Sequence, residues 1–555
     1  MERDASRGAV LDHHDAALPD WFVHFEIEIN VEQLKDLSVL ILGLGSSGLA
    51  MARWCARHGA QVSVVDTREQ PPGLADLKAQ APSAKFHVVA SFSEDLVQGQ
   101  EIRAVCRSPG LSPMQIAPVL GAARAMGLPV WGELDLFWMG LQSLKSSQNY
   151  QPKILAITGT NGKTTVTALT GQLVERAGKT VAVAGNIGPT LLDTLTQHID
   201  AKNDDQSDGQ SHDKSDLQNL PEVWVLELSS FQLEGVQDFI PTMGTVLNLT
   251  QDHLDWHGDM AAYSAAKARI FGEHSLGVPP MLLNRDDPAV LAMRPPLIKG
   301  KPQRSDISFG ADLPQRPGDY GIETVGGMTW LVRALEADET QKRRRNDKGD
   351  EVEIHLQRFM PADALRIRGR HNALNALAAL ALASAAGCSL SAMLYGLREY
   401  RGEPHRVEPV GILGDVAYFD DSKGTNVGAT VAALSGLGAE RKIVVILGGE
   451  GKGQDFSPLA HPVSLYARAV VLIGHDAALI QQALADTGVS VQTAASMEDA
   501  VKAASQLAHA GDAVLLSPAC ASFDMFKDYK HRAEVFVAAV NKLAHDTGVS
   551  LLEGA

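Results

Sequence analysis

Cysteine is scarce in this chain of 555 residues, which contains only four. The four lie far apart, at Cys55, Cys106, Cys388 and Cys520, and show neither the spacing of a zinc site nor that of a disulfide framework. Thiols of this kind fit a reducing compartment. We therefore expect a cytoplasmic protein without a thiolate metal site.

The chain also lacks a basic excess and a long apolar run. Its 49 Lys and Arg stand against 66 Asp and Glu, and the net charge of -17 argues against a nucleic-acid partner. The start, residues 1–4, is not a basic stretch leading into an apolar core, so we expect no secretory signal. The Ala- and Leu-rich stretch 373–387 is too short to cross a membrane and contains Asn375, so it predicts a buried helix.

The remaining composition, 45% hydrophobic and 21% charged, is typical of a globular protein of three or four domains. Strands alternate with helical stretches, which predicts an α/β fold. We expect a Rossmann-like N-terminal domain, a central ATPase-type domain with a phosphate loop, and a Rossmann-like C-terminal domain with a mostly parallel sheet. The expected division is a polar leader at 1–35, then domains at 36–148, 149–400 and 401–555, with insertions at 200–219 (solvated and mobile) and 336–350 (a hairpin loop).

The clearest chemical motif is a Gly-rich turn between an expected strand and an expected helix. It runs from Gly159 to Thr165 and contains Gly162, Lys163 and Thr164. Backbone N–H groups at such a helix start bind phosphate, Lys163 adds a point charge, and the Thr164 hydroxyl can reach a phosphate-bound Mg²⁺. The spacing is a shortened variant of the usual pattern, and the alternative is a Gly-rich turn with a surface lysine.

A second glycine pattern lies near the N-terminus. Gly43–Gly48 follows an apolar run, and Asp66 ends the next expected strand about 20 residues later. In isolation this pattern is typical of NAD binding, and the alternative is a turn that needs glycine for packing. The segment Ser108–Gly110 closes a later strand and is expected to line the same crevice.

Polar side chains follow several other expected strands. Glu227 ends one strand beside the phosphate loop, where a carboxylate can hold Mg²⁺, although a solvated strand-end Glu is the alternative. The segment 252–257 places two His and two Asp after the next strand, which indicates an ion or phosphate site, with a purely structural role for the histidines as an equal alternative. Asn284 could contact a base or ribose, and the polar start of the helix at 369–375 suits phosphate or base contact. In the third domain, polar clusters follow the strands that end near Asp420, Gly448 and Ser517.

These motifs together resemble the Mur ligase family, whose members form amides with ATP in peptidoglycan precursor synthesis. The resemblance covers about residues 35 to 545 and excludes the leader and both insertions. Three stretches resemble the branch that adds D-glutamate, and these are Gly43–Gly48, Asp66–Arg68 and Ser517–Phe526. The family motifs are Gly159–Thr165, Glu227–Leu233, Asp252–Asp255 with Lys267, His371–Ala376 and Asp421–Asn426.

The resemblance implies an activity and its partners. UDP-N-acetylmuramoyl-L-alanine and D-glutamate would be joined through an acyl phosphate, with ATP and two Mg²⁺ sites, by a cytoplasmic monomer that inserts into no membrane. The process would be cell-wall biogenesis, and through it cell shape and division. Hinges are expected near 300–305 or 400, because the third domain must bring the amine to the acyl phosphate.

The resemblance also implies roles for individual residues. Spacing alone gives Lys267 no role, but the family lysine at this position is carbamylated and shares a second Mg²⁺ with the position of His253. Tyr529 stands where D-glutamate-adding members often have Phe. The expected catalytic residues are Lys163, His253 and Lys267, and the expected metal ligands are Thr164, Glu227, His253 and Lys267. The ATP side comprises Gly159, Thr160, Asn161, Gly162, Lys163, Thr164, Thr165, Asn284, Asn372 and Arg406. The substrate side comprises Gly45, Ser46, Asp66, Thr67, Arg68, Gly110, Asn186, Ser229, Gln232, Lys423, Thr425, Lys452, Ser522 and Phe523.

Three other functions are compatible with parts of the sequence. A nicotinamide oxidoreductase would use the first glycines but would leave the phosphate loop unexplained. A nucleotide-dependent switch would use the loop without a second substrate. A folylpolyglutamate-type ligase would share the loop but should lack an N-terminal crevice for UDP.

Overall fold

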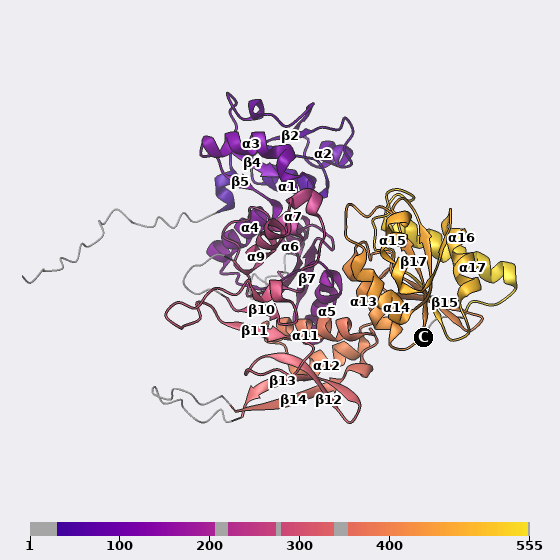
Figure 1. Cartoon of the computed structure of the whole chain (residues 1–555). Coiled ribbons are helices and arrows are strands. Elements are labelled where there is room, and N and C mark those ends of the chain that lie inside the picture. The colour runs from indigo at the N-terminus through magenta and orange to yellow at the C-terminus, as the bar shows by residue number, and fades with distance from the viewer. Residues whose placement is uncertain (1–29, 206–219, 273–278, 338–352, 553–555) are drawn as a thin grey trace, which may run out of the picture.

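The computed structural model describes residues 30–205, 220–272, 279–337 and 353–552. Most of the expected leader (1–35) and of the expected insertions (200–219 and 336–350) lies outside these residues. The described chain forms three sheets, each from its own stretch of sequence (Figure 1). No helix in these ranges has the length and apolar character needed to cross a membrane.

The N-terminal sheet has five parallel strands in the order β3-β2-β1-β4-β5. The chain moves outward from β1 through β2 to β3 and then returns to the other side of β1 with β4. The order therefore reverses between β1 and β4, which is where ligands bind in sheets of this type. The strands are β1 Ser38–Leu42, β2 Gln61–Asp66, β3 Lys85–Val88, β4 Ala104–Arg107 and β5 Val130–Trp131, with helices α1 Ser46–Arg57, α2 Leu74–Gln80 and α3 Pro113–Ala125.

The central sheet has nine strands in the order β14-β13-β12-β11-β10-β9-β6-β8-β7. Both faces of the internal strand β6 are covered, because Leu155 and Ile157 pack into one apolar core while Ile154 and Ala156 pack into another. This two-sided burial explains the nearly continuous apolar run before the phosphate loop. The strands are β6 Lys153–Thr158, β7 Val181–Gly185, β8 Val223–Glu227, β9 Met243–Val246, β10 Met281–Asn284, β11 Asp306–Phe309, β12 Tyr320–Val325, β13 Met328–Glu336 and β14 Ile354–Pro361.

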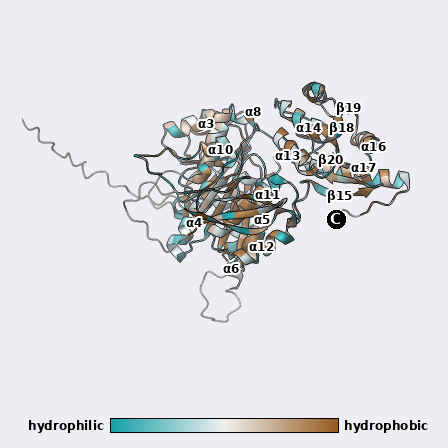
Figure 2. Cartoon of the chain, turned by 60° about the horizontal axis from the view of Figure 1, so that its bottom comes forward, coloured by the Kyte–Doolittle hydropathy of each residue, from teal (hydrophilic) through white to brown (hydrophobic). Residues whose placement is uncertain are grey.

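Helices of the central domain cover both faces of this sheet. Residues of α5 and α11 contribute to one core, and residues of α6 contribute to the other together with α4, which leads in from the N-terminal domain. Apolar residues colour the ribbon brown around α5 and α11 (Figure 2). The helices are α4 Glu133–Gln148, α5 Lys163–Arg176, α6 Leu191–Asp205, α7 Ser230–Leu233, α8 Leu254–His257, α9 Met260–Ala268, α10 Pro288–Leu291, α11 Arg370–Ala385 and α12 Leu390–Glu399.

The C-terminal sheet has six strands in the order β15-β16-β20-β17-β18-β19, and β15 is its antiparallel edge. Separate apolar cores lie on its two faces, one with α13 and α14 and the other with α16 and α17. The strands are β15 Glu408–Leu413, β16 Val416–Asp420, β17 Ile443–Gly448, β18 Ala467–Ile473, β19 Ser490–Thr493 and β20 Ala513–Leu516. The helices are α13 Val427–Gly438, α14 Ala460–Tyr466, α15 Ala477–Ala483, α16 Met497–Leu507 and α17 Tyr529–Thr547.

The expected α/β fold with three domains is confirmed, and two local expectations need correction. The sequence of residues 300 to 365 predicts irregular structure with weak strands at 307–309, 328–332 and 352–356, but this region forms four strands, β11 to β14, of which β12 has no counterpart in the prediction. Only the first half of β12 is buried, so its sequence lacks a clear alternation. The expected insertion at 200–219 begins within α6, which continues to Asp205.

A buried hydrogen-bonded chain fixes α4 against the central sheet. The indole Nε1 of Trp224 donates to Tyr150 Oη over 2.9 Å, and Tyr150 Oη donates to the carbonyl of Pro221 over 2.5 Å. Phe137 of α4 meets the Trp224 ring edge-on at 5.0 Å. The phenol of Tyr150 therefore satisfies two buried polar groups at once.

We predict that Tyr150→Phe lowers the stability of this region by about 1–3 kcal/mol, because it leaves Trp224 Nε1 and the Pro221 carbonyl without partners. Thermal unfolding followed by calorimetry checks this. Tyr395→Phe is the control, because Tyr395 is 58% exposed. Equal thermal midpoints for the two variants would contradict the prediction.

Candidate active site

The phosphate loop lies between β6 and α5 and depends on a glycine at its last position. Gly162 caps α5 with a left-handed backbone, at φ 83° and ψ -13°. A Cβ at this position would lie 2.7 Å from Oδ1 of Asn375, so a larger residue has neither the conformation nor the space. Helix α5 begins at Lys163, and its free N–H groups face the loop.

Asn248, which follows β9, holds the loop from the opposite side. Its Oδ1 accepts from the Asn161 N–H over 2.8 Å, its Nδ2 donates to the Asn161 carbonyl over 3.0 Å, and its own carbonyl accepts from the Thr160 N–H over 2.9 Å. The Thr160 hydroxyl lies 3.1 Å from the Tyr263 hydroxyl. Sequence reasoning assigned no role to Asn248 or Tyr263, because an Asn after a strand and a Tyr in a helix are common residues. Their hydrogen bonds fix the shape of the loop.

Two lysines donate to one carbonyl beside this loop. The ammonium groups of Lys163 and Lys267 both lie 2.9 Å from the Gly159 carbonyl oxygen. Burial lowers the pKa of both side chains, and the Lys267 pKa falls well below its usual value because the positive charge of Lys163 adds to its burial. Lys267 is 2% exposed, so its amine is the readier of the two to lose its proton.

A buried carboxylate completes this side of the site. Glu227 ends β8 at 1% exposure, and its Oε1 accepts from Asn186 Nδ2 over 2.6 Å. Its Oε2 has no hydrogen-bond partner in the described chain. An unpaired buried carboxylate oxygen is costly unless a cation binds there, so Glu227 fits the expected role of Mg²⁺ ligand. Thr164, another of the expected metal ligands, accepts a hydrogen bond at its hydroxyl from Arg406 over 2.7 Å.

His253 lies near the same charges. It precedes α8 with a left-handed φ of 54°, and its ring meets Phe231 edge-on at 4.7 Å. Burial lowers the pKa of His253, and the charges of Lys163, Lys452 and Lys267 lower it further, against the opposing charge of Asp252. A neutral imidazole is the form that binds metal, so these surroundings suit a metal ligand.

The C-terminal domain contacts the phosphate loop directly. The side-chain amides of Asn426 and Asn161 exchange hydrogen bonds of 3.1 and 3.2 Å, and Asn426 also donates to Asp252 over 3.3 Å. Asn426 ends a quoted family motif, but sequence reasoning gave it no role. Burial lowers the pKa of Lys423 to about 8, with nearby Arg406 and Lys163 adding to the effect. The ends of β16 and β17 therefore bring Lys423 and Lys452 toward the loop from a second domain.

A cavity adjoins the loop on its other side. Its volume is about 210 Å³, and it opens toward a larger cavity of about 850 Å³ between the central and C-terminal domains. The smaller cavity is lined by Asn284, and both cavities are lined by Asn372 and Arg406, so the three expected nucleotide contacts lie together. Asn284 Nδ2 also donates to the Leu247 carbonyl over 2.8 Å.

The remaining C-terminal residues vary in exposure. Ser522 is 3% exposed, whereas Phe523 is 64% exposed with Lys452 Nζ 5.9 Å from its ring centre. Lys423 Nζ lies 5.2 Å from the ring centre of Tyr529, so the tyrosine that replaces the family's Phe contacts an expected substrate residue. Thr425 is half-buried in the turn between Lys423 and α13.

The expected UDP-binding residues lie on the N-terminal sheet. Burial alone would raise the pKa of Asp66, but hydrogen bonds from Arg68 and from the Leu44 N–H lower it to about 2, so the carboxylate is ionised. Gly45, Ser46, Thr67, Arg68 and Gly110 are at least partly exposed at the carboxyl end of this sheet. Two expected residues of the central domain form the start of α7, where Ser229 Oγ accepts from the Gln232 N–H and Gln232 Oε1 accepts from the Ser229 N–H. The third, Asn186, is held by Glu227.

Comparisons with known proteins match three family descriptions in order along the chain. Residues 37–132 match the "Mur ligase MurD-like, N-terminal domain", residues 157–383 the "Mur ligase middle domain", and residues 405–520 the "Mur ligase, glutamate ligase domain".

Two relatives are similar over nearly the whole chain. The UDP-N-acetylmuramoylalanine--D-glutamate ligase of Albidiferax ferrireducens is 63% identical, with 93% of this chain and 98% of the relative covered. The protein of the same name from a Polaromonas species is 57% identical, with 94% of this chain and all of the relative covered.

Solved structures share the fold. UDP-N-acetylmuramate-alanine ligase MurC of Thermotoga maritima has a TM-score of 0.51 at 20% identity, over 91% of this chain and all of that one. MurF of Acinetobacter baumannii has a TM-score of 0.51 at 18% identity, over 91% of this chain and 97% of that one.

We predict that Gly162→Ala weakens ATP binding about tenfold or more, because Ala must adopt a left-handed backbone and displace the Asn375 amide. Isothermal titration with Mg-ATP checks this. Gly121→Ala in α3 is the control, since no atom lies within 4 Å of the added Cβ. Unchanged affinity in Gly162→Ala would show that the loop does not depend on this conformation.

Proposed function

The chain belongs to the Mur ligase family, and on this premise we propose that it joins D-glutamate to UDP-N-acetylmuramoyl-L-alanine. The reaction is an ATP-dependent acid–D-amino-acid ligation that produces ADP and phosphate, a step of peptidoglycan precursor synthesis. One observation carries the proposal beyond family membership. The phosphate loop of the central domain and the lysine-bearing strand ends of the C-terminal domain meet through Asn161 and Asn426.

The chemistry follows from bringing two anions together. A carboxylate oxygen of the muramoyl-L-alanine substrate attacks the γ-phosphorus of ATP, which forms an acyl phosphate and releases ADP. The amine of D-glutamate then attacks the acyl carbon, loses a proton, and displaces phosphate. The carboxylate and the triphosphate repel each other, so positive charge near the γ-phosphate lowers the barrier. Lys163 supplies part of that positive charge. The backbone N–H groups of the phosphate loop, whose shape Asn248 and Gly162 fix, would donate hydrogen bonds to the phosphate oxygens.

A magnesium ion fits beside the loop. Glu227, whose Oε2 lacks a partner, and Thr164 would hold it, and it would neutralise phosphate charge during transfer. Arg406 already hydrogen-bonds Thr164 and lines both cavities, so it is placed to contact the nucleotide as well.

A second magnesium ion is proposed between His253 and Lys267. A carbamate on Lys267 changes a cation into an anion able to bind metal. The carbamate forms when the unprotonated amine adds to carbon dioxide and releases a proton, and the buried Lys267 beside Lys163 has a lowered pKa that favours the unprotonated amine. The lowered pKa of His253 keeps its imidazole available as a ligand.

The two substrates are assigned to different domains. Residues 36–148 would bind the UDP end, residues 149–400 ATP, and residues 401–555 D-glutamate. Asn186, Ser229 and Gln232 belong to the central domain and would contact the sugar side. Lys423, whose pKa of about 8 leaves it mostly charged at pH 7, and Lys452 would balance the two carboxylates of D-glutamate. Thr425, Ser522 and Phe523 complete this pocket, and the protein is proposed to act as a cytoplasmic monomer.

We predict phosphate release only when UDP-N-acetylmuramoyl-L-alanine, Mg-ATP and D-glutamate are all present. L-glutamate should fail, because its amine points away from the acyl phosphate when both carboxylates are bound. A coupled phosphate assay with one amino acid changed at a time measures this. Release that ignores D-glutamate would favour a nucleotide switch, and amide formation with a folate acceptor would favour the folylpolyglutamate-type activity.

We predict that Lys267→Ala reduces kcat at least a hundredfold, whereas Lys301→Ala has little effect because Lys301 is exposed and remote from the loop. Carbon-13 NMR with labelled bicarbonate should show a carbamate signal in the natural protein that Lys267→Ala lacks. Equal activity losses in both variants, or a carbamate signal that persists in Lys267→Ala, would contradict the assignment.

A further inference from the structure

Arg107, at the end of β4, differs from the other buried arginines of the described chain. Three arginines are less than a tenth exposed, namely Arg107 at 6%, Arg304 at 8% and Arg532 at 0%. Arg304 donates to the carbonyls of Phe271, Gly272 and Pro279, and Arg532 donates to those of Ser422 and Cys520. In contrast, the guanidinium of Arg107 has no hydrogen bond or ion pair with any described residue. None of its nitrogens is among the fully enclosed polar atoms without a partner, so they face a space that water or a ligand can fill.

The nearby carboxylates are engaged elsewhere. Asp135 accepts hydrogen bonds from the N–H groups of Gly132 at 2.7 Å and Gln237 at 3.1 Å, one at each of its oxygens. Glu234 pairs with Arg269 over 3.6 Å. Burial lowers the pKa of Arg107, against the attraction of Asp135 and Glu234, while Arg269 and Arg124 add repulsion. The charge of Arg107 is thus surrounded but not directly paired.

Arg107 lies at the part of the N-terminal sheet where ligands bind in folds of this type. It lies opposite Leu42 of β1, on the two strands between which the strand order reverses. The glycine turn to the N-terminus of α1 follows Leu42, and the segment Ser108–Gly110 follows Arg107. A helix N-terminus and a guanidinium at the carboxyl ends of two neighbouring strands both favour an anion.

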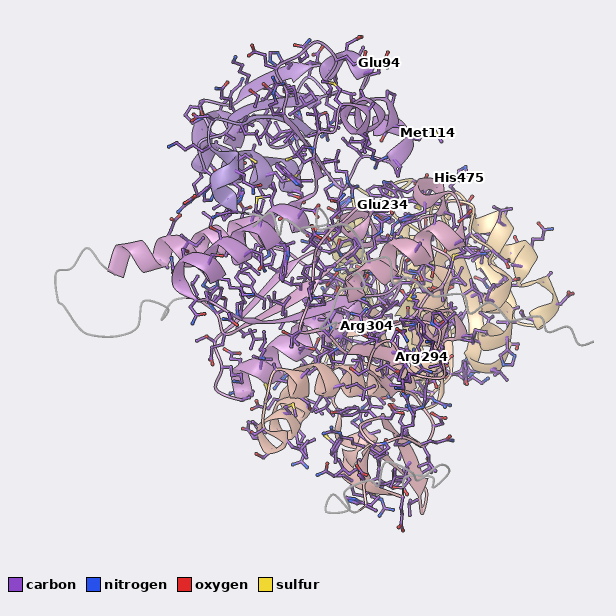
Figure 3. The ribbon with its side chains drawn as sticks, turned by 90° about the vertical axis from the view of Figure 1, so that its left-hand side faces the viewer. Glu94, Met114, Glu234, Arg294, Arg304 and His475 are labelled. Carbon is purple, nitrogen blue, oxygen red and sulfur yellow. The ribbon has the colours of Figure 1, made fainter. Side chains whose placement is uncertain are left out.

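The guanidinium also reaches the central domain. A Cβ added at Gly235 would lie 3.2 Å from Nη2 of Arg107, so Arg107 contacts the segment that follows α7. Helix α7 begins at the proposed sugar contacts Ser229 and Gln232. Figure 3 shows Glu234, the neighbour of Gly235, where the N-terminal domain meets the central one. Arg107 therefore lies between the residues proposed for the UDP end and those proposed for the sugar end.

We propose that Arg107 binds the diphosphate of the UDP-sugar substrate, an inference that rests on the proposed function. The diphosphate is the anionic group between uridine and the sugar, and it would give the unpaired guanidinium its missing acceptors. Arg107 takes no part in bond making, and it acts as a positioning residue that sets the affinity for the nucleotide half of the substrate.

The test is the affinity of UDP for the full chain, measured by isothermal titration, which needs no turnover. We expect Arg107→Gln to weaken UDP binding about tenfold to a hundredfold, the effect of losing a charge-assisted hydrogen bond, and to leave uridine binding unchanged. In the ligase assay the KM for the UDP-sugar should rise by the same factor, while kcat and the KM values for ATP and D-glutamate stay within about twofold. Arg107→Lys keeps the positive charge but loses the planar guanidinium, so its UDP affinity should lie between that of the natural protein and that of Arg107→Gln.

Two matched variants separate binding from folding. Arg103→Gln removes the same charge from an exposed position at the opposite end of β4 and should leave UDP affinity unchanged. Arg304→Gln removes a buried arginine that donates to carbonyl groups. It should lower the thermal midpoint of unfolding and leave the UDP affinity of the folded protein unchanged. If Arg107→Gln does not fold, the UDP affinity of Arg107→Lys decides.

Three outcomes would overturn the inference. The first is unchanged UDP affinity in a folded Arg107 variant, and the second is an equal loss of uridine and UDP. The third is weaker binding of the whole UDP-sugar with normal binding of UDP, which would place the contact on the substrate carboxylate instead. Failure of the proposed function looks different, because the natural protein would then release no phosphate with any UDP-sugar.

Discussion

The arrangement around the Gly159 carbonyl is the constraint on which the rest of the site depends. Two ammonium groups, from Lys163 and Lys267, share this one acceptor in a place largely removed from water. The carboxylates of Glu227 and Asp252 offset part of this positive charge, and the rest is offset when further negative charge arrives or when one lysine loses its proton. Both remedies serve the proposed reaction, because a triphosphate brings negative charge and a carbamate would reverse the sign of Lys267. The phosphate loop therefore carries excess positive charge that bound triphosphate and a carbamate on Lys267 would neutralise.

The topology of the three sheets explains why the polar residues of the site lie close together. Glu227, His253 and Asn284 follow parallel strands of the central sheet, and Lys423 and Lys452 follow strands of the C-terminal sheet. Parallel strands place their carboxyl ends along one edge, so residues far apart in sequence converge. The same rule places Arg107 beside the first glycine turn in the N-terminal sheet. Each sheet has one such edge, and the proposed reaction assigns one of its three substrates to each edge.

Much of this could be predicted from the sequence, because the signals are local. Several local features predict a strand that ends in polar residues, namely the glycine turns, Glu227 and the turns that contain lysine. The fold class follows from the alternation of strands and helices, although β12 was missed because only half of it is buried. Asn248, Tyr263 and Asn426 were not assigned, because their importance comes from contacts with distant residues. Arg107 gives no local signal at all, since only the packed structure shows that a buried arginine lacks an acceptor.

The contact between Asn161 and Asn426 has a consequence for the catalytic cycle. It joins two domains through neutral amides, each hydrogen bond contributing on the order of 1 kcal/mol in net terms. Contacts of this strength break in ordinary thermal motion, and they are far less sensitive to ionic strength than an ion pair. Two further hydrogen bonds cross the same boundary with a charged partner, from Asn426 to Asp252 and from Arg406 to Thr164, and these are the part of the docking that salt or bound phosphate can change. Separation of the C-terminal domain from the phosphate loop therefore requires these few hydrogen bonds to break together, and each time they break the loop is exposed for exchange of its bound nucleotide.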